Sequence, residues 1–254
     1  MKKMIAANWK MYKTRREAVQ TTAGIITNIL GKRLEDREFV IFAPFTALQS
    51  CADVLNAEAS GSRLFLGAQD VYPAGEGAFT GEISPVMLLD CSCAWVLAGH
   101  SERRHLLGES DEFIGKKTAF ALESGLNVVL CIGETLVERE SGQLERVLSG
   151  QMSAGLAAVP KDIKPSRLVF AYEPVWAIGT GKVAGSEEIM EAHALVRRLI
   201  KNFFPLQYAH MRILYGGSVK PDNAGQLIKL DNVDGLLVGG ASMEAESFSR
   251  IALA

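Results

Sequence analysis

The sequence predicts an α/β protein that folds as a single (β/α)8 barrel, and three observations lead to this prediction. Eight short apolar runs recur along the 254 residues, at a spacing of roughly 30, with amphipathic helical patterns between them. Most runs are continuous rather than alternating, which is typical of strands covered on both faces of a parallel sheet. A barrel of this kind is usually about 250 residues long. We therefore expect one domain that spans residues 1–254.

The expected strands are the eight apolar runs themselves. They cover residues 4–7, 39–43, 64–67, 95–99, 128–133, 168–172, 213–217 and 236–240. Runs of this length that are rich in β-branched and aromatic residues, such as residues 168–172, indicate buried strands.

Helices are expected between the strands because apolar residues recur there at helical spacing. Thr14 and Glu17 have the capping-box arrangement, so a helix should begin at this point. Ser186, followed by Glu187 and Glu188, is expected to cap a helix with an inward apolar stripe and a basic C-terminal end. The other amphipathic stretches are residues 47–55, 113–122, 136–156, 224–230 and 245–253.

An open doubly wound sheet is the alternative fold for alternating strands and helices. Such a sheet normally carries a Gly-x-Gly-x-x-Gly turn after an early strand. The glycines of residues 75–81 have the wrong spacing and follow no helix start. Because the sequence also contains no linker, low-complexity tract or apolar run of membrane length, the single barrel remains the prediction.

The charge balance indicates which classes of binding partner to expect, and the cysteine content indicates the cellular compartment. The 27 basic and 29 acidic side chains give a sequence pI near 6.1, so we expect neither a nucleic-acid partner nor an anionic membrane surface. Only about four apolar residues precede Asn8, too few for a signal-peptide core. The four cysteines are scattered and no Asn-x-Ser/Thr sequon occurs, which favours a reducing cytoplasm. Cys91 and Cys93 lack a matching second pair, so no metal site is expected.

Polar side chains and glycines follow most of the apolar runs, at the positions where a barrel places its active site. These residues are Asn8, Lys10, Gln69, His100, Glu102, Glu173, Gly216, Gly217, Ser218, Gly239 and Gly240. Glycines let backbone N–H groups approach an anion closely, and the loops after strands seven and eight commonly hold phosphate. The glycines after the last two runs therefore predict a phosphate site, although the plainer interpretation is that they only form tight turns.

The three charged or titratable candidates each have a structural alternative. A carboxylate such as Glu173 at the end of a buried run must be paired or have a use. His100 is either a satisfied structural residue or a functional one; the Ser101-Glu102 sequence after it looks like a helix start, which would keep its ring neutral. Lys10 is either a solvated lysine or a ligand for substrate charge, and the phosphate site favours the second. A nucleotide P-loop is excluded at residues 179–182, because Trp176 stands where its first glycine should be.

With these residues assembled, the sequence resembles the triosephosphate isomerase family over essentially the whole chain. The segments that carry the resemblance are residues 7–11, 67–69, 77–82, 99–104, 131–134, 171–181, 215–219 and 238–242. The resemblance implies the TIM barrel fold and a cofactor-free isomerase of glycolysis and gluconeogenesis. Such an enzyme interconverts D-glyceraldehyde 3-phosphate and dihydroxyacetone phosphate by proton transfer through an enediolate.

The resemblance also implies roles for individual residues. Glu173 would be the catalytic base and neutral His100 the electrophile, with Lys10 and Asn8 near the developing charge and Glu102 as a supporting carboxylate. The substrate phosphate would be bound by Asn8, Lys10, Gly179, Ser218, Gly239 and Gly240.

Two further segments take their roles from the same resemblance. Residues 170–184 would carry the active-site lid, which begins at Pro174 and is held shut by Tyr215 and Ser218. The other lid residues are Val175, Trp176, Ala177, Ile178, Thr180, Gly181 and Lys182. Residues 72–84 would form the interface loop of a homodimer, with Thr80 reaching the neighbouring subunit's site.

Two positions differ from the pattern of the family, and two other functions are compatible with the sequence. Val183 stands in the second lid hinge where the family often has threonine, and Ala98 replaces a larger aliphatic residue before His100. The competing functions are a Schiff-base aldolase of the phosphate-binding barrel class, for which Lys10 would be the nucleophile, and a non-catalytic phosphate-binding scaffold.

Overall fold

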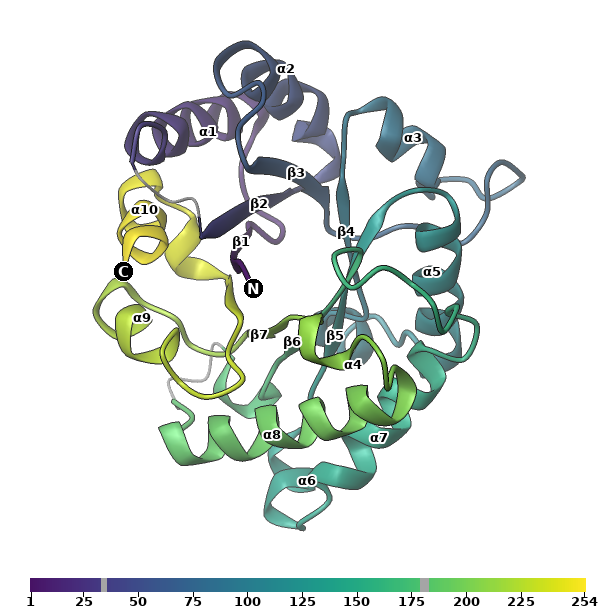
Figure 1. The fold of residues 1–254 in the computed structure, drawn as a ribbon. Coiled ribbons are helices and arrows are strands. Elements are labelled where there is room, and N and C mark those ends of the chain that lie inside the picture. Colours follow the sequence, from purple (N-terminus) through teal and green to yellow (C-terminus); the bar gives the residue numbers. More distant parts are fainter. Residues whose placement is uncertain (33–35, 179–182) are drawn as a thin grey trace.

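The computed structural model describes residues 1–32, 36–178 and 183–254 and confirms the predicted barrel (Figure 1). Eight strands close into one ring in the order β1 to β8, and every neighbouring pair is parallel. This closure excludes the open doubly wound sheet. The strands are β1 Lys3–Asn8, β2 Arg37–Ala43, β3 Leu64–Ala68, β4 Trp95–Ala98, β5 Asn127–Ile132, β6 Leu168–Tyr172, β7 Ile213–Tyr215 and β8 Gly235–Val238.

The helices form an outer layer around the strands (Figure 1). The described helices are α1 Arg15–Ile29, α2 Leu48–Glu58, α3 Pro85–Asp90, α4 Ser101–His105, α5 Asp111–Glu123, α6 Leu136–Glu140, α7 Leu144–Gly155, α8 Ser186–Phe203, α9 Pro221–Leu227 and α10 Ala245–Leu253. Four short 3₁₀ helices join them, namely η1 Phe45–Ala47, η2 Val175–Ala177, η3 Tyr208–His210 and η4 Gly240–Ser242. None of the described helices is long and apolar enough to cross a membrane.

Local sequence explains where most of these helices begin. Thr14 caps α1 as predicted, because its backbone N–H donates to the Glu17 carboxylate at 2.7 Å. Two expectations were wrong in detail. The N-cap of α8 is Gly185 rather than Ser186, and its N–H is bound by the Glu188 carboxylate at 2.8 Å. Residues 136–156 form two helices instead of one, because the chain turns between them at Gly142 with a φ of 67°.

The apolar residues are divided between two layers, which explains why the strands read as continuous apolar runs. In β1, Met4 and Ala6 point into the barrel, whereas Ile5 and Ala7 pack against the surrounding helices. The interior layer as a whole contains Met4, Ala6, Val40, Phe42, Trp95, Leu97, Val129, Cys131, Val169, Ala171, Leu214 and Leu237. The barrel is therefore a packed core, and a ligand can be bound only at its ends.

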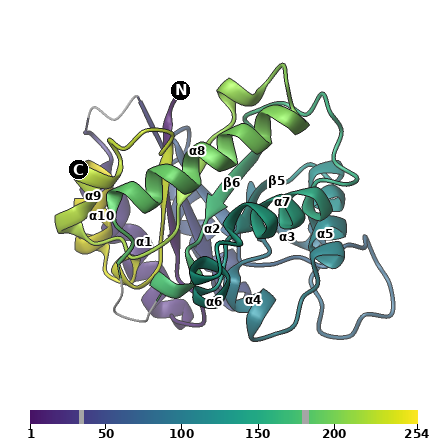
Figure 2. The same cartoon turned by 90° about the horizontal axis from the view of Figure 1, so that it is seen from below.

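The two ends of the barrel differ in chemistry. At the amino ends of the strands, the buried Arg212 guanidinium binds the Glu38 carboxylate at 3.1 Å and stacks over the Trp95 ring at 5.5 Å. At the carboxyl ends lie α4, η2 and the long segment 72–84, which projects from the side of the molecule in both ribbon views (Figure 2). The candidate site lies at this second end.

Candidate active site

Most of the residues predicted at the strand ends line one cavity of about 370 Å³. Asn8 and Lys10 after β1 and His100 after β4 lie on its walls. Its other lining residues are Tyr12, Ala177, Ile178, Gly216, Gly217, Ser218, Val219, Lys220, Leu237, Gly239, Gly240, Ala241 and Met243. The walls therefore combine cationic side chains with glycine-rich backbone from the ends of β7 and β8.

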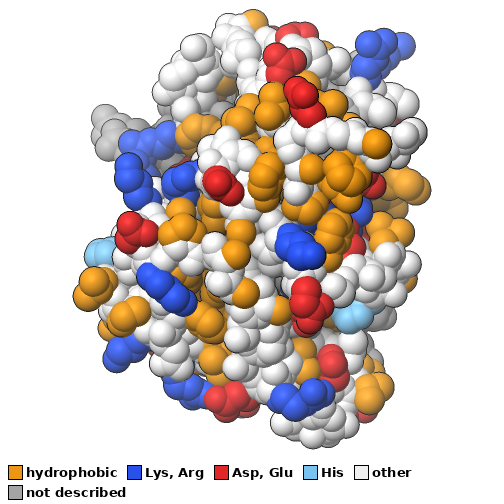
Figure 3. Space-filling model, turned by 90° about the vertical axis from the view of Figure 1, so that its right-hand side faces the viewer, with side chains coloured by type: hydrophobic (Ala, Val, Ile, Leu, Met, Phe, Trp, Pro, Cys, Tyr) orange, Lys and Arg blue, Asp and Glu red, His pale blue; other side chains and the backbone are white. Residues whose placement is uncertain are grey.

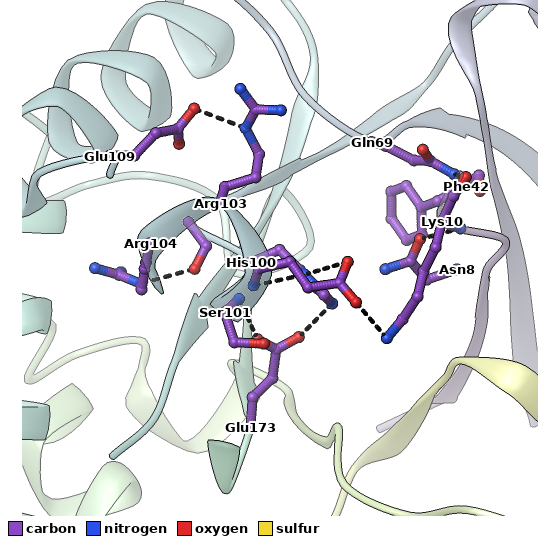
Figure 4. Close-up of polar contacts among 12 residues, drawn as sticks. Asn8, Lys10, Phe42, Gln69, His100, Ser101, Arg103, Arg104, Glu109 and Glu173 are labelled. Carbon is purple, nitrogen blue, oxygen red and sulfur yellow. Dashed lines mark hydrogen bonds and ion pairs between the residues drawn. The ribbon is translucent and has the colours of Figure 1, made fainter. Parts of the chain in front are cut away.

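Lys10 is held in an unusual backbone conformation that aims its side chain at the site (Figure 4). Its φ is 51°, its N–H donates to the Asn8 side-chain oxygen at 3.0 Å, and its carbonyl accepts from the Gln69 amide at 2.9 Å. The ammonium pairs with the Glu102 carboxylate at 2.7 Å. A Cβ at Gly239 would lie 3.3 Å from the Lys10 Cε atom, so the glycine gives this side chain room.

His100 connects the end of β4 to α4 and serves as the N-cap of that helix. Its ring Nδ1 accepts from the Glu102 backbone N–H at 3.3 Å, which leaves the ring proton on Nε2 in the neutral tautomer. Nε2 lies 3.2 Å from a carboxylate oxygen of Glu173 (Figure 4). The helix start predicted after His100 is therefore present, and it determines which ring nitrogen can donate toward the site.

Glu173 follows β6 and is only 2% exposed. One carboxylate oxygen faces His100, and the other accepts the Ser101 backbone N–H at 2.8 Å. Glycines on both sides make space, since a Cβ at Gly133 would lie 1.8 Å from the Glu173 carbonyl oxygen and one at Gly216 would lie 2.9 Å from its Cγ atom. The hydrogen-bond donors of this buried carboxylate come from His100 and Ser101 at the start of α4. In the described conformation the carboxylate does not line the cavity.

The two glycines after β7 are closely packed, whereas Gly240 after β8 leaves open space. A Cβ at Gly217 would lie 2.2 Å from the Tyr215 hydroxyl oxygen, so no larger residue fits in this conformation. Burial raises the pKa of Tyr215 to about 12, which keeps its hydroxyl protonated at neutral pH. Ser218, Gly239 and Gly240 all line the cavity, as predicted from their positions in the sequence.

The first part of the predicted lid is anchored to a buried carboxylate. Glu134 accepts from the Trp176 ring N–H at 2.9 Å and from the Tyr172 hydroxyl at 3.0 Å, and its carbonyl accepts the Val175 N–H at 3.1 Å. Burial raises the pKa of Glu134, and these donors oppose that rise. Among the remaining lid residues, Ala177 and Ile178 line the cavity. Gly179, Thr180, Gly181 and Lys182 lie outside the described residues.

Some residues with clear contacts at the site were not assigned roles from the sequence. Ser101 binds Glu173 through its backbone N–H, Gln69 binds the Lys10 carbonyl, and Glu134 binds Trp176 in the first part of the predicted lid. Glu134 directly follows the fifth apolar run, so the same strand-end signal that marked Glu173 applies to it. Thr80 lies on the exposed segment 72–84 and does not line the cavity of its own subunit. Among the described residues, no cluster of His, Cys, Asp and Glu side chains is arranged to hold a metal ion.

A closed barrel that gathers a carboxylate, an imidazole and an ammonium at the carboxyl ends of its strands is typical of an enzyme of the (β/α)8 class. Comparison with known proteins narrows this class. The family model described as triosephosphate isomerase matches residues 3–254. The chain belongs to the triosephosphate isomerase family, so the family and the isomerase class predicted from the sequence are confirmed.

Full-length relatives support the same assignment. Proteins named triosephosphate isomerase from Oleidesulfovibrio alaskensis and from Nitratidesulfovibrio vulgaris strain Miyazaki F are each 61% identical to this chain over 254 residues, which is the whole of both proteins. The protein of that name from Chloroflexus aurantiacus is 46% identical over 98% of this chain and 97% of its own length.

Proposed function

We propose that the protein interconverts D-glyceraldehyde 3-phosphate and dihydroxyacetone phosphate, with Glu173 as the base and His100 as the electrophile. The observation that carries this proposal is the 3.2 Å contact between His100 Nε2 and the Glu173 carboxylate beside the Lys10 ammonium. Three groups of the required chemistry are within reach of one small molecule at the strand ends. Membership of the triosephosphate isomerase family supports the same reaction.

Glu173 carries the proton between the two carbons. Its carboxylate leaves the Ser101 N–H, turns toward the cavity, and removes a proton from C1 of the ketose or from C2 of the aldose. It then returns the proton to the neighbouring carbon. The isomerisation is complete once the hydroxyl proton has also passed from one oxygen to the other, through the His100 Nε2 nitrogen. General-base catalysis of this kind contributes about 10² to 10⁴-fold to a rate.

His100 and Lys10 stabilise the charge that forms during this transfer. Removing the proton produces an enediolate, whose negative charge is spread over the two oxygens. The neutral His100 ring donates its Nε2 proton to that charge, and the Lys10 ammonium and the Asn8 amide lie on the same wall of the cavity. Glu102 holds the ammonium in place through the 2.7 Å ion pair. The donors are oriented before the substrate arrives, so little reorganisation is needed.

The substrate phosphate binds against the glycines at the ends of β7 and β8. Ser218, Gly239 and Gly240 line this side of the cavity, and their backbone N–H groups are suited to an anion. We expect Gly179 to complete the phosphate site when the lid closes, with Tyr215 holding the closed lid. Closure would exclude water and thereby prevent elimination of phosphate from the enediolate.

We also infer that the active form is a homodimer of two cytoplasmic subunits. A second cleft, of about 440 Å³, adjoins the site beside Lys10, and Phe45, Leu97 and Leu107 are among its lining residues. Hydrophobic side chains gather on the upper part of the face that carries segment 72–84 and α3 (Figure 3). The exposed large hydrophobic residues of these two elements are Phe79, Val86, Met87 and Leu89.

A second copy of the chain fits these features best. The projecting segment 72–84 would enter the neighbour's apolar cleft, and a two-fold axis would return the same contact, with Thr80 near the neighbour's Lys10. Analytical ultracentrifugation should give a mass of two chains, and a fully active monomer would contradict the pairing. The cytoplasmic assignment rests on the four cysteines, which are all unpaired thiols in the described structure.

The test of the reaction is a coupled assay on the purified protein. Glyceraldehyde 3-phosphate should be converted to dihydroxyacetone phosphate, read out by a glycerophosphate dehydrogenase that oxidises NADH. Binding of inorganic phosphate without turnover would support the scaffold instead. Borohydride reduction with dihydroxyacetone phosphate should leave Lys10 unlabelled, because its nitrogen is engaged as a cation with Glu102; covalent trapping there would favour the aldolase.

A further inference from the structure

Arg104 is a buried arginine that touches three separate elements beside the site without lining the cavity. Its side chain is 6% exposed. The Nε–H donates to the Gly99 carbonyl at 2.7 Å, one terminal nitrogen donates to the Cys131 carbonyl at 2.9 Å, and the other pairs with the Asp111 carboxylate. Figure 4 places Arg104 on the side of His100 that faces away from Lys10.

The two carbonyls lie where the backbone pairing between β4 and β5 stops. The last paired residues of these strands are Ala98 and Leu130. Gly99 and Cys131 come directly after them, and the guanidinium bridges their carbonyls in place of further ladder hydrogen bonds. Two donors of one rigid planar group thus set the separation of the two strand ends, and a third binds Asp111.

The end of β4 leads into His100, and the end of β5 binds the backbone of Glu173, which follows β6. Gly99 directly precedes His100 and has a φ of 72°, a left-handed conformation that sets the direction of the chain into α4. On the other strand, the Ile132 carbonyl after Cys131 accepts the Glu173 backbone N–H at 2.8 Å. A change in the separation of the ends of β4 and β5 therefore moves His100 relative to Glu173.

Local packing shows that this bridge is tightly fitted. A Cβ at Gly99 would lie 2.8 Å from a terminal nitrogen of Arg104, so the guanidinium occupies the space that a side chain would need. Burial, and then the neighbouring Glu173 charge, raise the pKa of the Cys131 thiol, which places residue 131 beside the carboxylate as well. The Asp111 carboxylate balances the buried positive charge of Arg104.

We propose that Arg104 is a positioning residue for the isomerisation, whose guanidinium ties the ends of β4 and β5 together and so fixes the His100 ring against the Glu173 carboxylate. This inference rests on the proposed function. Arg104 touches neither the cavity nor the reacting atoms, so it acts through the backbone of Gly99 and Cys131. Its loss should affect the chemical step and leave phosphate binding intact, because the glycine cradle lies at the ends of β7 and β8.

The test is Arg104→Lys, because a single ammonium cannot reach both carbonyls and the Asp111 carboxylate together. A displacement of about 1 Å in a catalytic group can cost on the order of 10²-fold in rate, so we expect kcat to fall about 10 to 100-fold. The KM for glyceraldehyde 3-phosphate should change by less than about twofold. Affinity for 2-phosphoglycolate, whose carboxylate copies the charge of the enediolate, should fall with kcat, whereas affinity for inorganic phosphate should not.

Arg212→Lys is the matched control. Arg212 has the same 6% side-chain exposure and also pairs with one carboxylate, but it lies at the amino ends of the strands. This variant should lower the thermal unfolding temperature and leave kcat unchanged. An equal loss of kcat in both variants would show that Arg104 contributes only to the stability of the fold, and it would overturn the proposal.

Two further measurements test the proposal if the Arg104→Lys variant folds poorly. Asp111→Asn removes only the charge partner and should lower kcat about threefold at constant KM. The nitrogen-15 NMR signal of the His100 ring should shift in either variant. An unaltered protein that fails to turn over substrate would refute the proposed function, whereas an unmoved His100 signal together with unchanged kcat in the variants would refute the positioning role.

Discussion

The substitution His193→Asn tests how strongly one buried histidine makes the free energy of unfolding depend on pH. His193 lies on α8, is fully buried, and its Nδ1 is 2.9 Å from the Asn232 carbonyl oxygen. The Tyr172 ring packs edge-on against it with centroids 5.8 Å apart. Burial, together with the nearby Arg197 charge, lowers the pKa of His193 to about 4.

The size of the effect follows from this lowered pKa. In the unfolded chain this histidine has a pKa near 6.5. Between about pH 6.5 and pH 4 it is therefore protonated in the unfolded chain but not in the folded one, which favours unfolding. Stability is therefore complete above pH 6.5 and falls as the pH is lowered through this window. At pH 4.5 the loss amounts to about 2 to 3 kcal/mol, and below pH 4 it stops growing.

The assay is urea unfolding followed by circular dichroism at pH 7.5 and at pH 4.5, at one protein concentration. His193→Asn keeps a side-chain donor for the Asn232 carbonyl but cannot titrate. Its loss of stability between the two pH values should therefore be smaller than that of the unaltered protein by about 2 to 3 kcal/mol. His210→Asn, at an exposed histidine, is the control and should behave as the unaltered protein does. Equal pH dependence in all three proteins would refute the reasoning.

Two other substitutions probe the cavity. Gly217→Ala forces a methyl group to within 2.2 Å of the Tyr215 hydroxyl, so we expect about 1 to 3 kcal/mol of destabilisation in thermal melts. The control is Gly150→Ala on α7, where a Cβ meets nothing within 4 Å, and it should stabilise the protein by about 1 kcal/mol. Equal effects of the two substitutions would show that the contact with the Tyr215 hydroxyl is unimportant. Lys10→Met should lower kcat/KM at least 10²-fold by removing the fixed positive charge, and an unchanged kcat/KM would exclude Lys10 from the mechanism.

The barrel could be predicted from sequence because its constraints are local and repeated. Each strand is buried on both faces, so it appears as an apolar run, and each helix shows its own apolar stripe. The carboxyl ends of parallel strands meet at one end of a barrel, which is why Lys10, His100 and Glu173 could be grouped although they are far apart in the sequence. The strand-end rule also marked the glycines of the phosphate side.

The parts that were not predicted depend on neighbours that the sequence does not reveal. The break between α6 and α7 arises from the left-handed turn at Gly142, while the surrounding residues keep a helical pattern. The Ser101 backbone N–H donates to the Glu173 carboxylate from 72 residues away, so the residue type at position 101 does not signal the contact. Arg104 looks like any other charged residue on a short helix until its two carbonyl partners are seen.

The assignment of Glu173 as the base is tested most directly by the kcat of Glu173→Asp in the coupled assay. The shorter side chain pulls the carboxylate back by about 1 Å from the position where it faces His100 at 3.2 Å. We predict that kcat falls on the order of 10²-fold while KM stays nearly constant, and that Glu38→Asp at the amino ends of the strands changes neither. A Glu173→Asp protein that turns over glyceraldehyde 3-phosphate at the unaltered rate would contradict the proposal that this carboxylate moves the proton.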